Sequence, residues 1–311
     1  MTFYLSNMKS IFFFFLCVFQ SISIFGYAKQ DSIIIKGVLL GDFKTSKVSL
    51  YACNKTEPII EKSISEKKFS LMLPGNIEPG VYRLRYHNEE SIVTEVIVDN
   101  NEKSISYEIK KGNFFYHPLP VFKESKINQK WIEYINETQV RVDRLNSLFN
   151  FFTEFPTQLD NKILRYYQKE RRQYYKIFSK FIRNNSNNWV GLLVANQPYY
   201  FSDLKKKPVV RDFLRHEYFW VDIDTNNPKL INSPLYINHI NNYLNYVDDV
   251  TKHYPFTQEE KQKELIKHID VILDKFSKNA QTKKFAYEYL LQVFTLENNK
   301  ELVDYIINKY S

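Results

Sequence analysis

The hydrophobic pattern of this 311-residue chain changes its period near residue 115, and this change separates two kinds of domain. Before that point, short segments alternate apolar and polar residues, and turn residues such as Pro79-Gly80 separate them. A period of two is typical of half-buried strands. About seven such segments, with no helical pattern between them, predict an antiparallel β-sandwich over residues 29–112. The segments are 32–40, 47–53, 59–64, 68–73, 81–86, 92–98 and 104–109.

After a predicted linker at residues 113–122, which contains Pro118 and Pro120, apolar residues recur every three or four positions. This spacing is typical of amphipathic helices and predicts an all-α domain of roughly seven or eight helices over residues 123–311. Thr257 and Glu260 have the spacing of a capping box, and Ser233 is expected to cap the helix that follows Pro234. The predicted fold class is therefore α+β in two domains, a β-sandwich followed by an all-α domain.

The first 28 residues hold one charge, Lys9, followed by an apolar run from Ile11 to Phe25 and by Gly26-Tyr27-Ala28. A basic start, an apolar stretch and small residues before the cleavage point are typical of a secretory signal peptide. A retained membrane anchor is the alternative, but the run is interrupted and shorter than the ~20 residues of a spanning helix. We therefore expect a signal peptide at residues 1–28, a periplasmic or cell-envelope location, and no membrane span after cleavage.

Charge and cysteine content limit the partners. The whole chain has a formal net charge of +8, so the chain after residue 28 carries +7. A modest positive charge on an exported protein favours anionic membrane surfaces or polyanionic envelope polymers as neighbours, and export argues against nucleic acid. Only Cys53 remains after residue 28, so no intramolecular disulfide is expected.

Residues that could carry chemistry are sparse. The six histidines have no metal-binding spacing, and each is interpreted as a surface or capping residue. Asp222, Asp224 and Asn226 imitate the start of a calcium loop, but Asn227 and Ser233 stand where that loop needs Gly and Glu. Turn and cap hydrogen bonds are the preferred interpretation of that segment. We expect no catalytic residues, no cofactor and no metal site, and the question of an enzymatic role stays open.

The basic and aromatic stretch at residues 165–176 suggests a surface for polyanions or sugars. On a helix, however, Tyr167 and Tyr174 fall on the apolar stripe, whereas Lys169 and Arg172 point elsewhere. We interpret the stretch as a core-facing tyrosine stripe with a solvated basic face.

Four motifs of the first half are similar to the N-terminal domain of unknown function in exported thioredoxin-like proteins of the TlpA/ResA kind in Gram-negative bacteria. They are IIIKG at 33–37, VSLY at 48–51, KFSL at 68–71 and PGVYRL at 79–84. The second half resembles the helical connecting region of the same proteins through YFWVDID at 218–224, NPKLINSP at 227–234 and INNYL at 240–244.

The resemblance implies an envelope location and a two-part scaffold. In that family a thioredoxin domain with a Cys-x-x-Cys pair usually follows, but this chain contains no Cys-x-x-Cys. The family's redox residues therefore have no position here onto which they can be carried.

The sequence thus predicts a non-catalytic binding or interaction protein of the envelope, whose partner is another protein, including a separate thioredoxin-like chain. One alternative is a component of a thiol–disulfide or peroxide-reducing system in which Cys53 is a reactive thiol. Another is glycan binding by the aromatic-rich helical domain. The expected contact surfaces are an edge strand of the sandwich and the groove between the domains, at Tyr218, Trp220, Asp222, Asp224, Pro228 and Pro234.

Overall fold

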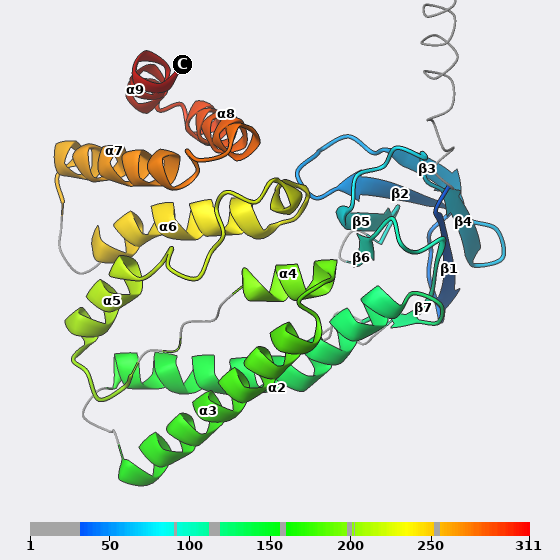
Figure 1. Ribbon diagram of the computed structural model, residues 1–311, viewed down its shortest axis with the longest axis horizontal. Coiled ribbons are helices and arrows are strands. Elements are labelled where there is room, and N and C mark those ends of the chain that lie inside the picture. The colour runs from blue at the N-terminus through cyan, green and yellow to red at the C-terminus, as the bar shows by residue number, and fades with distance from the viewer. Residues whose placement is uncertain are drawn as a thin grey trace, which may run out of the picture.

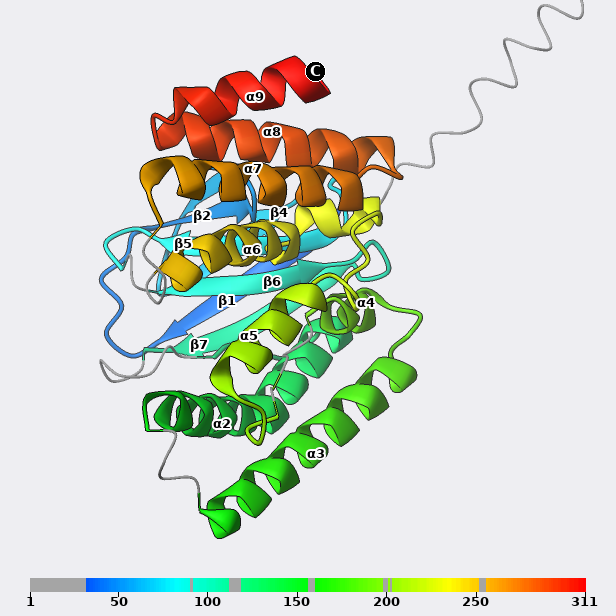
Figure 2. The same ribbon diagram turned by 90° about the vertical axis from the view of Figure 1, so that its left-hand side faces the viewer.

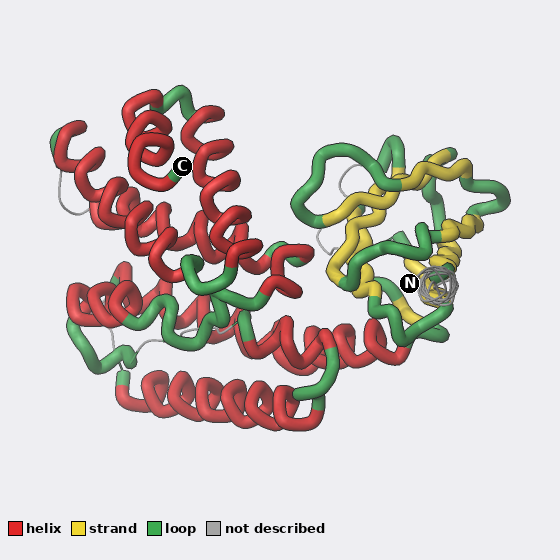
Figure 3. Tube along the Cα trace, turned by 45° about the horizontal axis from the view of Figure 1, so that its top comes forward, coloured by secondary structure: helices red, strands yellow, loops and turns green. Residues whose placement is uncertain are grey.

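The computed structural model describes residues 32–89, 92–111, 119–155, 160–197, 201, 203–251 and 256–311. The predicted signal peptide at 1–28 and most of the predicted linker lie outside these residues. A β-rich part is followed by a helical part, so the predicted fold class is confirmed (Figure 1). Figure 3 shows the strands gathered at one end and the helices occupying the rest.

Two four-stranded sheets face each other in the sandwich. One has the order β4-β1-β7-β8 and the other the order β3-β2-β5-β6. All pairs are antiparallel except β1 with β7, which run parallel with Ile34 opposite Ser104. The strands are β1 (Ile34–Leu40), β2 (Lys47–Ala52), β3 (Ile60–Ser63), β4 (Lys68–Met72), β5 (Gly80–Tyr86), β6 (Val93–Val98), β7 (Ser104–Lys110) and β8 (Val121–Phe122).

Alternating side chains of both sheets fill the space between them, as the period of two requires. Ile35, Leu50, Leu84 and Ile105 are fully buried there. β8 lies inside the range predicted as a linker and pairs with β7, with Phe122 opposite Tyr107. The end of that range is therefore part of the sandwich.

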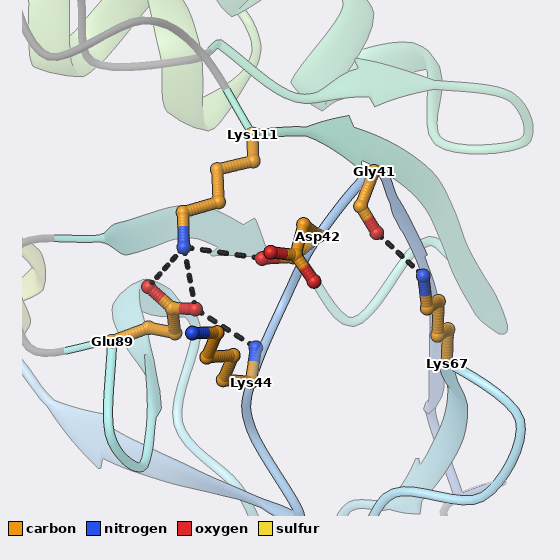
Figure 4. Close-up of polar contacts among 6 residues, drawn as sticks. All are labelled: Gly41, Asp42, Lys44, Lys67, Glu89 and Lys111. Carbon is orange, nitrogen blue, oxygen red and sulfur yellow. Dashed lines mark hydrogen bonds and ion pairs between the residues drawn. The ribbon is translucent and has the colours of Figure 1, made fainter.

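A carboxylate ties together three segments at one end of the sandwich (Figure 4). The Glu89 carboxylate, which is buried, accepts hydrogen bonds from Lys111 Nζ at 2.7 and 2.8 Å and from Lys44 N at 2.9 Å. Lys111 Nζ also donates to the Asp42 carbonyl at 3.1 Å. Burial alone would raise the pKa of Glu89, but the hydrogen bonds and charge of Lys111 outweigh it, so this pKa is lowered.

Eight α-helices and one 3₁₀-helix make up the described helical part. They are α2 (Lys126–Glu154), α3 (Asn161–Asn184), α4 (Trp189–Ala195), α5 (Pro208–Glu217), η2 (Pro228–Asn232), α6 (Leu235–Thr251), α7 (Gln258–Lys275), α8 (Ala280–Leu296) and α9 (Lys300–Tyr310). Helices α2 and α3 form a long hairpin, and Figure 2 shows α7, α8 and α9 stacked in order. Within the described residues, no helix combines the length and the apolar character that crossing a membrane requires.

Helix starts follow the caps expected from the sequence. Thr257 and Glu260 form the complete capping box of α7. Ser233 Oγ accepts from Leu235 N at 3.3 Å at the start of α6. Tyr167 and Tyr174 are fully buried, whereas Lys169 and Arg172 are exposed, so the interpretation of the basic stretch as one face of a helix is confirmed.

The junction between the two parts is polar at its contact points and apolar behind them. The side chain of Asn128 in α2 forms hydrogen bonds with the backbone of β6, as a neighbouring strand would. Its Oδ1 accepts from Ile97 N and its Nδ2 donates to Ile97 O, both at 2.7 Å. The Glu102 carboxylate accepts from Ile127 N at 3.0 Å and from the Ser125 hydroxyl. Behind these contacts Ile97, Val81 and Cys53 join the buried core of the helical part.

A second junction contact involves a glycine. Asn232 Nδ2 donates to the Tyr82 hydroxyl at 2.9 Å, and a Cβ at Gly80 would lie 2.2 Å from the same Nδ2 and 2.5 Å from the Asn232 carbonyl oxygen. Gly80 therefore lets η2 approach the start of β5.

Replacement of Asn128 by alanine tests the junction. Asn128→Ala leaves the buried N–H and C=O of Ile97 without their partner, so we expect the free energy of unfolding to fall by about 2–4 kcal/mol. Urea denaturation followed by circular dichroism measures the change. Asn136→Ala, at an exposed position of the same helix, serves as the control and is expected to stay within about 0.5 kcal/mol of the parent. Equal stability of the two variants would contradict this role of Asn128.

Candidate functional site

A cleft of about 830 Å³ lies between the α2–α3 hairpin and the segment that joins α5 to α6, and we call it the helical cleft. α2 contributes Asn146, Phe149 and Asn150, and α3 contributes Tyr175, Phe178, Ser179 and Ile182. The opposite side is formed by Ala195, Gln197, Phe201, Arg215, Tyr218, Phe219, Asp222, Ile223, Leu235, Asn238, His239 and Asn242.

Aromatic rings provide most of the apolar lining. Phe149, Tyr175, Phe178 and Phe219 are half-buried, so each ring keeps part of its surface open. Phe178 is held in place by Tyr174, whose ring stacks on it with a centroid distance of 5.9 Å. Rings fixed in this way can receive an apolar ligand surface with little loss of side-chain freedom.

Carboxamides surround the rings. Asn146, Asn150, Asn238 and Asn242 are exposed, and none of their amide groups hydrogen-bonds to another described residue. Each carboxamide offers both donors and acceptors. An apolar lining surrounded by such groups suits a ligand that alternates apolar surface with neutral polar groups.

The charged and titratable groups of the helical cleft are few. Arg215 and Asp222 are exposed and opposite in charge. His239 is buried, and its Nε2–H donates to the Asn196 carbonyl at 2.7 Å. Burial lowers the pKa of His239, so this ring is neutral at pH 7.

The structure does not bring the six predicted surface residues onto one surface. Tyr218 and Asp222 line the helical cleft, but Trp220 is only 7% exposed and packs in the core against Phe276, with ring centroids 6.0 Å apart. The prediction of Trp220 as a surface residue is thus corrected. The turn-forming residues Asp222 and Asp224 follow the indole in the chain, which favours a loop position, whereas the core of α6 and α7 encloses it.

The remaining three predicted residues are not among those that line the helical cleft. Pro228 lines a second depression of about 660 Å³ between the sandwich and the helices, which also includes Glu78, Pro79 and Asn188. Pro234 is half-buried just before α6. Asp224 forms the predicted turn, because its carboxylate accepts hydrogen bonds from Asn226 N at 3.3 Å and from Asn227 Nδ2 at 3.2 Å.

Sequence reasoning missed most of the helical cleft. Phe149 and Phe178 fit the apolar stripes of their helices, a pattern that predicts core positions, and no motif marks Asn238 and Asn242 as ligand-binding residues. One signal was available: the two asparagines are four residues apart on α6, a spacing that places them on the same side of a helix.

Cys53 follows β2 and points into the core. Its side chain is buried beside Val81 and Ile97, and it is a free cysteine. Burial raises the pKa of the thiol to about 12. A reactive thiol needs the opposite environment, one that stabilises the thiolate.

Two histidines, His216 half-buried and His268 buried, form a pair between α5 and α7. His216 Nε2 lies 3.0 Å from His268 Nε2, and His268 Nδ1 lies 2.9 Å from the Glu264 carbonyl. Because a carbonyl only accepts, His268 carries its proton on Nδ1, and His216 Nε2–H donates to His268 Nε2. The interpretation of His268 as a surface or capping residue is corrected, because its side chain is 3% exposed.

A scan against protein-family models, a search of curated proteins and a search of solved structures each find no match to this chain. The resemblance to exported thioredoxin-like proteins therefore rests on the sequence motifs alone. Within the described residues, no group of three or more His, Cys, Asp or Glu side chains could hold a metal ion.

The environment of Cys53 predicts slow thiol labelling. At pH 7.5 a maleimide or dithiobis(nitrobenzoate) reagent should modify Cys53 at less than about one hundredth of the rate of an unfolded thiol, because burial limits access and disfavours the thiolate. Labelling in native buffer and in 8 M urea gives the ratio, with a Cys17→Ser background removing the other thiol. Fast native labelling would contradict the buried position and favour the redox alternative.

The histidine pair predicts a loss of stability in acid. Burial, reinforced for His216 by the charge of His268, lowers the pKa of both rings below the usual 6.5. The unfolded chain therefore binds more protons than the folded chain as the pH falls through 6.5, and the free energy of unfolding decreases between pH 7.5 and 5.5. Urea midpoints at the two pH values measure this decrease.

The variant His216→Gln/His268→Gln serves as the comparison for this pH dependence. It should be less stable at pH 7.5 and should lose less stability on acidification than the parent. Part of the slope remains, because His239 also has a pKa lowered by burial. An unchanged slope in the double variant would contradict the assignment of the acid sensitivity to the pair.

Proposed function

We propose that the protein is an exported, non-catalytic binding protein of the cell envelope, and that the helical cleft binds an extended segment of another envelope protein. The observation that carries this proposal is the lining of the cleft, in which half-buried rings are surrounded by exposed carboxamides. Peptide side chains would occupy the aromatic surface, and the carboxamides would pair with the peptide backbone.

The location and the scaffold role rest on the sequence. The apolar run at residues 11–25 and the small residues after it support export. The likeness to the sandwich and connecting region of exported thioredoxin-like proteins supports a role as a two-part scaffold. A separate thioredoxin-like chain is one partner that would fit this proposal. The buried Cys53 thiol, with its raised pKa, argues against redox chemistry at that residue.

Glycan binding is a second candidate for the same cleft. Half-buried rings such as those of Tyr175 and Phe178 can stack on the apolar faces of sugars. Carboxamides such as that of Asn238 can form hydrogen bonds with pairs of sugar hydroxyls. Calorimetric titration with polysaccharides isolated from the envelope distinguishes this ligand from a peptide.

Site-specific photo-cross-linking in cells that export the protein tests the proposal. A photoreactive residue at Asn150 or Asn238 in the cleft should give the same discrete protein adduct, whereas one at Lys278, an exposed residue between α7 and α8, should not. Adding Tyr218→Ala to the Asn150 cross-linker should weaken the adduct several-fold, because the exposed ring lines the cleft. Mass spectrometry identifies the partner. Equal cross-linking from Lys278, or none from the cleft, would contradict the proposal.

A further inference from the structure

The polarity of α5 is reversed relative to an ordinary surface helix. Val209, Val210 and Phe213 share one face through the i, i+3 and i+4 spacings, and this face points outward: Val209 is 63% exposed and Phe213 is 60% exposed. Arg211, by contrast, is buried, with its guanidinium 5.1 Å from the centre of the Phe149 ring. Figure 2 shows α5 on the near side of the molecule with no described element in front of it.

The reversed helix is locally unfavourable in the free protein. Arg211 Nε and Nη1 are buried without a hydrogen-bond partner, and large apolar side chains face water. Such violations of local consistency are expected where a surface has a function. The outward apolar face, defined by Val209, Val210 and Phe213, therefore has the character of an interaction surface, and we call it the α5 face.

Unpaired cations border this face. Lys205, Lys206 and Lys207 directly precede α5 and are exposed. None of these three lysines has a carboxylate of the described chain within ion-pair distance. Asp212 and Glu217 are also exposed on α5, but the three lysines outnumber them, so the occupant of the α5 face should combine apolar surface with negative charge.

We propose that the α5 face docks on an anionic lipid bilayer surface. The apolar side chains would enter the region between headgroups and acyl chains, as they do for interfacial amphipathic helices. The lysines would lie at the level of anionic headgroups, where each strengthens binding about five-fold at low ionic strength. A lipid surface suits the α5 face, because an outward helix face with no described element in front of it can lie flat on a bilayer.

This proposal is independent of the helical cleft. Lys205–Lys207 and Val209, Val210 and Phe213 are not among the residues that line the cleft. Loss of lipid binding would leave peptide binding intact, and the reverse also holds.

Flotation with lipid vesicles tests the proposal. The full chain is compared with a form that starts at Lys29 and contains every described residue, because the apolar segment Ile11 to Phe25 itself partitions into bilayers. The form from Lys29 should bind vesicles of phosphatidylcholine with 30% phosphatidylglycerol at 50 mM salt. It should bind phosphatidylcholine alone at least ten-fold more weakly, and 500 mM salt should release most of it.

Two variants assign the binding to the α5 face. K205E/K206E/K207E should weaken binding to the anionic vesicles by about a hundred-fold or more, since three favourable charges are lost and reversed. V209S/V210S/F213S should weaken it at least ten-fold, with a stability equal to or above that of the parent because these side chains are exposed. K275E/K278E/K283E, an equal charge change at exposed positions of α7, α8 and the turn between them, should bind within about three-fold of the parent.

Several outcomes would overturn the proposal. No binding of the parent to anionic vesicles would do so, as would equal weakening by the α7–α8 control, which indicates attraction by net charge alone. Unchanged binding of V209S/V210S/F213S would show that the apolar side chains do not enter the bilayer. Binding of an acidic protein through α5, without vesicle binding, would assign the face to a protein partner instead.

Discussion

The pair of hydrogen bonds between Asn128 and Ile97 sets the position of the helical part relative to the sandwich. β6 is the last strand of its sheet, and an exposed edge of that kind would leave backbone groups unpaired. Asn128 satisfies both polar groups of Ile97 with one side chain, and Glu102 satisfies Ile127 N in the first turn of the same helix. One contact therefore covers the sheet edge and fixes the start of α2.

The positions of residues at the C-terminal end of α2 depend on how its N-terminus is held. Phe149 lies 22 residues after Ile127, which corresponds to about 33 Å along a helix. A small change of direction at Asn128 would move Phe149 by several ångströms, and with it one wall of the helical cleft and the ring against which Arg211 packs. The second junction, in which Asn232 reaches Tyr82 beside Gly80, places the start of α6 and thus the opposite wall. The cleft is consequently a product of the junction, although no sandwich residue lines it.

Local pattern was sufficient to predict most of the elements. Strands such as Lys68–Met72 begin and end within a few residues of the predicted ranges, and α7 begins at the predicted capping box, because periodicity and capping are properties of neighbouring residues. The contacts that make the site are not local: Asn128 and Ile97 are 31 residues apart in the chain, and His216 and His268 are 52 residues apart. Single-sequence periodicity carries no signal for such pairs. Trp220 illustrates the same limit, since turn residues surround it in the chain and core residues surround it in space.

Helix α5 shows why the direction of an amphipathic helix cannot be taken from its sequence. Its apolar residues at 209, 210 and 213 satisfy the pattern of a buried stripe, yet they face water, whereas Arg211 is inside. The ring of Phe149 offers the guanidinium a cation–π contact that partly offsets its burial. That contact holds Arg211 inward, so the apolar side of α5 faces outward. One turn later, Arg215 and Tyr218 line the helical cleft. The inward position of Arg211 thus shapes two neighbouring surfaces, the helical cleft proposed to bind a polypeptide and the α5 face proposed to bind lipid.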